Sequence, residues 1–277
     1  MSVRLVFNSV WRNPGNRGRR FGRLGRAVRW QVRKRVARTA KVIQLANGMR
    51  FKAYPDCVVS SALVYSEWPE YWELRFVRQF LQPGEAIIDV GANVGHISLL
   101  LADIAGPENI FAFEPTPISF RRLVENWALN GWGNTRLFPC AVGRACGLVR
   151  VPDTTRPETK NSIAGAPAAG RTVEVPLVTL DSFRPHWSGR RVGLLKIDVE
   201  GYEREVFAGA RDLLREDRPR LVMFESLQGS VDSEVAPALR NARYKVFQLD
   251  EAGRPELDRA SAQNLFAVPE ENTSALH

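Results

Sequence analysis

The chain has 277 residues, of which 44% are hydrophobic and 25% charged, as is typical of a globular protein with a sizeable core. It contains no apolar run of about 18 residues and no apolar signal core, so we expect a cytoplasmic protein without a transmembrane helix. Three cysteines without a C-x-x-C pair and three scattered histidines argue against a disulfide framework and against a zinc hydrolase.

The net charge of +9 is concentrated at the N-terminus. Residues 1–55 contain 15 Lys or Arg and no Asp or Glu, whereas the remainder holds 24 basic and 30 acidic residues, a net charge of −6. A basic N-terminal segment is therefore joined to a mildly acidic domain.

The first 40 residues are predicted to form a basic arm. Residues 1–20 are rich in Gly, Asn, Pro and Arg, which favours disorder. From Leu24 to Ala40, apolar residues recur near helical spacing between arginines, which predicts a basic amphipathic helix. This helix could dock on the rest of the protein, lie peripherally on an anionic membrane or contact nucleic acid.

Residues 41–83 are predicted to pack on the main domain. Asn47-Gly48 lies between two alternating apolar stretches, which is a strong hairpin signal. A helix is expected over residues 69–81, with Pro69 in its first turn and Pro83-Gly84 closing it off.

From residue 84 to 277, strand and helix patterns alternate, which predicts an α/β domain with a mostly parallel sheet covered on both faces. The expected strands are 85–90, 109–114, 135–142, 193–199, 220–225, 244–249 and 264–268. The expected helices are 96–105, 117–130, 203–216 and 233–242. Residues 147–180 interrupt the alternation with two short strands around a loop rich in Pro, Gly and Ala.

The stretch "IIDVGANVG" predicts a nucleoside-binding turn between the first strand and its helix. Gly91 and Gly95 permit tight turning, and Asn93 tolerates a positive φ. Asp89 at the strand end would repel a pyrophosphate but suit a cationic ligand, and Glu114 at the next strand end could accept hydrogen bonds from ribose hydroxyls. This combination favours S-adenosyl-L-methionine over NAD, and so argues against an NAD-dependent sugar-modifying enzyme.

The stretch "LLKIDVEGYERE" ends an apolar strand with Lys196, Asp198 and Glu200. As the fourth strand of the sheet it should lie beside the first, where the strand order reverses and ligands gather. The carboxylates would then lie near the methyl donor. Glu225 ends the fifth strand and would approach the same edge.

Three roles are open for these carboxylates, and Lys196 could either pair with Asp198 or bind an acidic substrate group. A carboxylate could act as a base, the protein could merely position the acceptor, or Asp198, Glu200 and Glu225 could bind Mg²⁺.

The motifs "IDVGANVG", "FEPTP", "NSI" and "LLKIDVEGYEREVFAGA" together resemble the FkbM family of S-adenosylmethionine-dependent methyltransferases, over residues 41–268. The resemblance implies a Rossmann-like methyltransferase fold, a seven-stranded sheet whose last strand ("NLFAV") is antiparallel, and O-methylation of small molecules or glycans. It also implies cofactor roles for Asp89, Gly91, Asn93, Gly95 and Glu114. His96 stands where the family usually has an aromatic residue, and Glu70 matches a glutamate that precedes the sheet in relatives.

We therefore expect an O-methyltransferase acting on a small-molecule, sugar or lipid-linked glycan hydroxyl. The alternative is an RNA methyltransferase or nucleic-acid-binding protein recruited by the basic arm. The acidic balance of the main domain and the lack of an N/D-P-P-Y signature argue against it.

Overall fold

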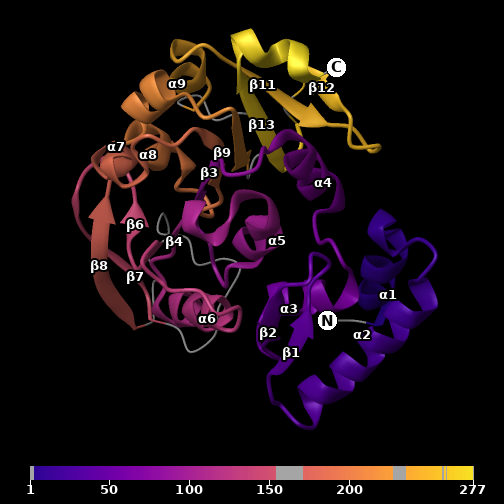
Figure 1. Ribbon diagram of the computed structural model, residues 1–277. Coiled ribbons are helices and arrows are strands. Elements are labelled where there is room, and N and C mark those ends of the chain that lie inside the picture. Colours follow the sequence, from indigo (N-terminus) through magenta and orange to yellow (C-terminus); the bar gives the residue numbers. More distant parts are fainter. Residues whose placement is uncertain (1–2, 154–170, 227–234, 258, 260, 277) are drawn as a thin grey trace.

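The computed structural model describes residues 3–153, 171–226, 235–257, 259 and 261–276. Its centre is an eight-stranded sheet with the strand order β12-β11-β13-β10-β9-β3-β4-β5 (Figure 1). The strands are β3 (Ala86–Val90), β4 (Ile110–Phe113), β5 (Leu137–Phe138), β9 (Val192–Ile197), β10 (Leu221–Glu225), β11 (Tyr244–Leu249), β12 (Pro255–Leu257) and β13 (Asn264–Pro269).

The sheet has the predicted Rossmann-like arrangement. β3 pairs in parallel with both β4 and β9, so the first and fourth strands are neighbours where the order reverses. β13 lies antiparallel between β10 and β11, which confirms the expected antiparallel last strand. The eighth strand was not expected. β12 pairs antiparallel with β11 at the sheet edge, where its Pro255 needs no ladder donor.

Helices cover both faces of this sheet. They are α4 (Tyr71–Phe80), α5 (His96–Ala105), α6 (Pro117–Ala128), α7 (Leu180–Phe183), α8 (Glu203–Ala208) and α9 (Val235–Asn241). Shorter helical turns span Pro107–Asn109, Arg184–Trp187, Leu213–Asp217 and Glu270–Leu276. The side chains of β3 alternate between two apolar cores, with Ile88 in one and Ile87 in the other.

A small second sheet accounts for the interruption in the alternation. It has the order β6-β8-β7, formed by β6 (Ala141–Val142), β7 (Gly147–Pro152) and β8 (Thr172–Val178). Residues 135–142 were expected to form one strand but divide between the two sheets. Pro139 lies at the division, where its missing N–H prevents a continuous ladder. The "NSI" motif lies outside the described residues.

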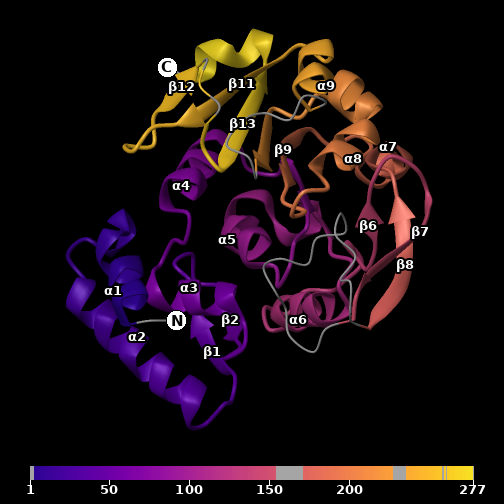
Figure 2. The same cartoon turned by 180° about the vertical axis from the view of Figure 1, so that it is seen from behind.

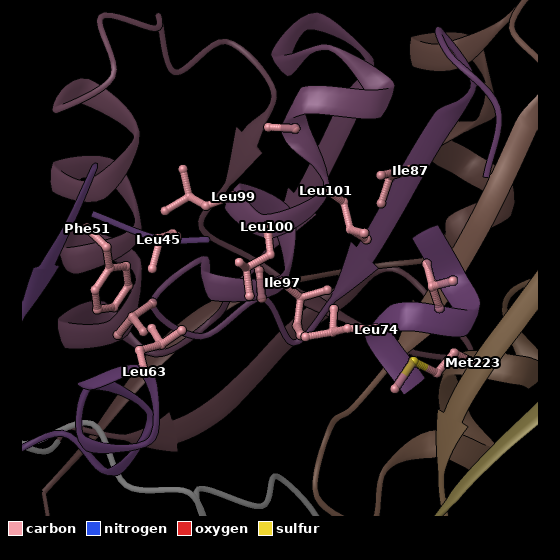
Figure 3. Close-up of a cluster of buried hydrophobic side chains, with 14 of the residues drawn as sticks. Leu45, Phe51, Leu63, Leu74, Ile87, Ile97, Leu99, Leu100, Leu101 and Met223 are labelled. Atoms are coloured by element: carbon pink, nitrogen blue, oxygen red, sulfur yellow. The ribbon is translucent and has the colours of Figure 1, made fainter. Parts of the chain in front are cut away.

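The N-terminal residues fold against the main domain. They form α1 (Val3–Arg12), a turn at Pro14–Asn16, α2 (Arg20–Arg35), the hairpin of β1 (Lys41–Gln44) and β2 (Arg50–Ala53), and α3 (Val58–Tyr65). Figures 1 and 2 show this group at the opposite end of the molecule from β11 and β12. Leu45, Phe51 and Leu63 share one apolar core with α5 and Met223 (Figure 3).

The prediction of disorder over residues 1–20 is wrong for the described part, residues 3–20. Val6 and Val10 of α1 are buried, and the buried Asn16 side chain donates hydrogen bonds to the main-chain oxygens of Val10 and Tyr65, at 2.9 and 3.1 Å. These contacts give a polar, Gly-rich segment the tertiary support that its composition does not reveal. None of the described helices is long and apolar enough to cross a bilayer.

Helix α2 docks through a face that its apolar periodicity did not indicate. Arg23, Ala27 and Trp30 are buried, whereas Val28 and Val32 are each 55% exposed. Arg23 is paired with Glu67, which allows its burial, and Trp30 Nε1 donates to Ser61 Oγ at 3.1 Å.

We predict that Trp30→Ala lowers the free energy of unfolding by about 3–5 kcal/mol, because it leaves a large cavity under α2. Val32→Ala on the exposed face should change it by no more than about 0.5 kcal/mol. Urea unfolding followed by circular dichroism measures both variants. Equal effects would contradict the docking of α2 by its Trp30 face.

Candidate active site

The carboxyl ends of four neighbouring parallel strands meet at one edge of the sheet. Val90 of β3 is level with Phe113 of β4 and Ile197 of β9, and Ile197 is level with Phe224 of β10. The polar residues that follow or end these strands therefore converge at this edge. Because open α/β sheets bind ligands there, this is the candidate active site.

A buried ion pair joins β3 and β9 beneath this edge. Asp89 and Lys196 are register partners and are 0% and 3% exposed. Lys196 Nζ donates to Asp89 Oδ1 at 3.1 Å and to the Gly91 oxygen at 3.3 Å, and lies 3.6 Å from Asp198 Oδ2. Ser98 Oγ donates to the other oxygen of Asp89 at 2.7 Å. Burial opposes the charge on Lys196, but Asp89 and Asp198 outweigh it and raise the pKa of Lys196.

The glycine turn approaches neighbouring chain segments so closely that side chains are excluded. Gly91 has a φ of 78°, and a Cβ there would overlap with the main-chain oxygen of Asp198. Gly95, with a φ of 83°, precedes α5, and a Cβ there would overlap with Leu123. The Gly91 N–H donates to the Phe113 oxygen at 2.9 Å, which ties the turn to β4.

Glu114 lies beside this turn at the end of β4. It is 5% exposed, and its two carboxylate oxygens accept hydrogen bonds from the main-chain N–H groups of Asn93 and Thr116, at 2.9 and 2.8 Å. Burial raises the pKa of Glu114 to about 6, although these hydrogen bonds partly offset the effect. Asn93 has a φ of 52°, and its buried Oδ1 has no hydrogen-bond partner among the described residues.

The loop after β9 carries Asp198 and Glu200 and is held by a carboxylate. Glu203 Oε1 accepts hydrogen bonds from the N–H groups of Val199 and Gly201, each at 3.2 Å. Glu200 adopts a φ of 54°, which a non-glycine residue rarely does without such support. No pattern in the sequence indicates this role of Glu203, because an acidic residue at the start of a helix is already explained by its interaction with the helix dipole.

The three carboxylates considered for Mg²⁺ lie together at the edge. One carboxylate oxygen from each of Asp198, Glu200 and Glu225 lies within 4.8 Å of the chosen oxygens of the other two. Glu225 accepts a hydrogen bond from Gln263 Nε2 at 2.6 Å. Burial, followed by repulsion from Asp198 and Glu203, raises the pKa of Glu225. Gln263 precedes β13, and no pattern in the sequence linked it to this site.

Two further ionisable residues lie close to the same charges. His96 is 8% exposed, its Nδ1 has no hydrogen-bond partner among the described residues, and burial together with Lys196 lowers its pKa to about 4. His96 is therefore neutral at neutral pH. The residue Glu70 as a whole is exposed, but its carboxyl group is desolvated by surrounding protein atoms. This desolvation, together with repulsion from Asp198, raises the pKa of Glu70 to about 7.

In a comparison with known protein families, residues 89–246 match the family described as the methyltransferase FkbM domain. This chain belongs to the FkbM methyltransferase family. The match spans the glycine turn, the Asp89–Lys196 pair and the carboxylates of Asp198, Glu200 and Glu225. Membership of this family supports S-adenosylmethionine as the methyl donor.

Relatives within the FkbM methyltransferases differ in their named substrates. The chain is 31% identical over 199 residues to the 31-O-demethyl-FK506 methyltransferase FkbM of Streptomyces tacrolimicus, which covers 60% of this chain and 75% of that protein. It is 25% identical over 142 residues to the hexuronic acid methyltransferase AglP of Haloferax volcanii. This alignment covers 51% of this chain and 56% of AglP. The crystal structure of an FkbM methyltransferase from Methylobacillus flagellatus KT has a TM-score of 0.46 at 16% identity, covering 90% of this chain and 60% of that one.

We predict that Gly91→Ala destabilises the protein more than Gly84→Ala does. Both glycines have a φ of 78°, but space around Gly84 is open, whereas Gly91 faces the Asp198 main chain. The strained φ alone should cost about 1 kcal/mol. Overpacking should add about 1–3 kcal/mol at Gly91. Thermal unfolding of the two variants measures the difference, and equal losses would contradict the close approach.

Proposed function

We propose that the protein transfers a methyl group from S-adenosylmethionine to a hydroxyl oxygen of a sugar, glycan, glycolipid or secondary metabolite. The observation that carries the proposal is the contact between the glycine turn and the main chain of Asp198, which brings the cofactor loop and a carboxylate together at one sheet edge. The named substrates of the relatives, an FK506 derivative and a hexuronic acid, support a small acceptor over RNA.

The residues around the turn fit a bound nucleoside. The Glu114 carboxylate is held by two main-chain donors and keeps lone pairs for ribose hydroxyls, and the buried Oδ1 of Asn93 lacks a partner within the described chain. Gly91 and Gly95 fix the shape of the turn, since a Cβ at either position would overlap with the Asp198 main chain or with Leu123. Asp89 has no exposed surface and both its oxygens have protein partners, so we assign it an indirect role, through Lys196 and the Gly91 oxygen.

The chemistry assigned to the protein is alignment and proton removal. When bound, the cofactor supplies an electrophilic methyl group on a sulfonium, and the acceptor oxygen must lose its proton as it is alkylated. We assign Asp198 as the base, because its side chain is 43% exposed and accessible to an acceptor. Lys196, 3.6 Å away, would orient this carboxylate.

A second role for the same carboxylates is favoured by their clustering. Asp198, Glu200 and Glu225 offer only oxygen ligands, which suits Mg²⁺, and a bound ion would acidify the acceptor hydroxyl. We propose the direct base first, since it needs no additional group.

The setting of the reaction is also part of the proposal. We infer peripheral contact with an anionic membrane through residues 1–40, which would bring the enzyme near lipid-linked acceptors. The cytoplasmic location stays a prediction. So does the division of the chain into a basic arm (residues 1–40), a segment packed on the main domain (41–83) and the methyltransferase domain (84–277).

Cofactor affinity should fall as the pH drops through about 6, where Glu114 becomes protonated and can no longer accept hydrogen bonds from two hydroxyls. Glu114→Gln should weaken binding by about 10–100-fold at neutral pH and flatten this dependence. Titration calorimetry with S-adenosylmethionine measures both effects, with the exposed Glu108→Gln as control. An unchanged affinity in Glu114→Gln would remove Glu114 from the cofactor site.

Asp198→Asn should reduce methyl transfer by about 10²–10⁴-fold and leave cofactor affinity within about threefold, because it removes a base but keeps the shape. The assay follows tritium from labelled S-adenosylmethionine into a panel of hexuronic acids, neutral sugars and polyketide alcohols. Asp212→Asn on the exposed surface is the control.

Retained turnover in Asp198→Asn would exclude Asp198 as base or essential ligand. Loss of activity in EDTA that Mg²⁺ restores would favour the metal role, and activity unaffected by EDTA would exclude it. Transfer to RNA instead of the panel would overturn the proposed acceptor class.

A further inference from the structure

Helix α2 carries a second apolar face that the protein does not cover. Phe21, Val28, Val32 and Val36 are 81%, 55%, 55% and 77% exposed. They are spaced by seven, four and four residues, and Val36 is the C-cap residue that directly follows α2, so they lie along one side of the helix. We call these four residues the α2 stripe. It lies roughly opposite the docked face of Arg23, Ala27 and Trp30 on the helix. Figures 1 and 2 show α2 at the rim of the molecule.

Aromatic residues of α1 extend this stripe. Phe7 is 41% exposed and stacks on Trp11, with ring centroids 5.2 Å apart and an interplanar angle of 14°. Trp11 contacts Phe21 edge-on at 5.8 Å. An apolar surface therefore continues from one helix to the other. Contiguous exposed apolar surface on a folded protein marks an interaction site more often than scattered single residues do.

Uncompensated positive charge lies beside the stripe. Residues 3–38 contain 12 arginines or lysines and no acidic residue. Arg26, Arg29 and Arg33 line a cavity of about 220 Å³ between α2 and the β1 strand. Arg26 and Arg29 also line a wider, open groove of about 730 Å³ that reaches Lys41. Within the described chain neither Arg26 nor Arg29 forms an ion pair, whereas Arg19 and Arg23 share Glu67.

An apolar strip bordered by arginines is the pattern of a helix that lies in the plane of a membrane interface. Apolar side chains enter the boundary of the acyl chains, and guanidinium groups bind the lipid phosphates. Nucleic acid would satisfy the arginines but leave Phe21 and the valines exposed to water. A second copy of this chain would bring two strongly basic surfaces together, which is electrostatically unfavourable.

We propose that α1 and α2 form a docking surface for an anionic phospholipid bilayer, in which the α2 stripe and Phe7 insert while Arg26, Arg29 and Arg33 contact the lipid phosphates. This names the residues of the proposed membrane contact and rests on that contact, but not on the methyl transfer. The surface would hold the enzyme on the membrane without a spanning segment.

Vesicle sedimentation of the full-length protein tests this surface, without cofactor or acceptor. The wild type should sediment with vesicles of phosphatidylcholine and phosphatidylglycerol, remain free with phosphatidylcholine alone, and be released by high salt. Phe21→Ser/Val28→Ser/Val32→Ser should weaken binding by at least about tenfold, because three inserting side chains are lost. Arg26→Gln/Arg29→Gln/Arg33→Gln should weaken it by about a hundredfold, at about fivefold per charge.

Two controls distinguish binding through this surface from binding caused by any exposed apolar residue or by the net charge alone. Leu148→Ser alters a side chain that is 69% exposed on β7, and Arg150→Gln/Arg254→Gln/Arg259→Gln removes the same charge from exposed positions elsewhere. Both controls should bind like the wild type. Melting curves that match the wild type verify that the test variants are folded.

Several results would overturn the proposal. They are equal sedimentation with both kinds of vesicle, unchanged binding of either triple variant, and equal losses in the controls. A wild-type dimer that the stripe variant dissociates, or RNA binding without vesicle binding, would assign the surface to a different partner. Because methyl transfer is not measured here, a failure of vesicle binding leaves the enzyme assay unaffected, and the reverse also holds.

Discussion

The arrangement of the candidate active site depends on the buried Asp89–Lys196 ion pair. Removing two charges from water is costly, and loss of one partner from a buried pair typically costs about 3–5 kcal/mol because the other charge remains unpaired. Here the ammonium group also contacts the Gly91 oxygen and lies near Asp198. One cation therefore fixes the ends of β3 and β9, the glycine turn and the Asp198 carboxylate together. Apolar residues could hold the strands equally well, but they could not orient a carbonyl and a carboxylate.

Two other carboxylates serve the loops around this pair. Glu114 holds the main chain at Asn93 and Thr116, and Glu203 holds it at Val199 and Gly201. Each supports a loop in which a non-glycine residue has a positive φ, at Asn93 and at Glu200. Such conformations cost about 1–3 kcal/mol and persist only where neighbouring groups enforce them. An acidic residue near a site can therefore shape the backbone alone, as Glu203 does, or hold the main chain while it keeps lone pairs for a ligand, as proposed for Glu114.

The sequence predicted those features that depend on local pattern and strand order. The alternation of strands and helices, the neighbouring positions of β3 and β9, and the convergence of Asp198, Glu200 and Glu225 follow from periodicity and from parallel strands ending at one edge. Features that depend on tertiary partners were missed. Disorder was expected where Val10 and Asn16 find buried contacts, and the docked face of α2 includes Arg23, whose burial requires Glu67. No periodicity rule places an arginine in a core before its partner is known.

The net charge describes the protein poorly, because positive and negative charges are distributed unevenly along the chain. The value of +9 combines a basic segment of +15 over residues 1–55 with a remainder of −6. Near an anionic surface the first part is attracted and the second repelled, within a range of about 10 Å set by salt screening. A torque results that favours approach through α1 and α2 before any apolar residue is in contact. Charge would then select the orientation, and the apolar stripe, which acts only at contact, would prolong residence.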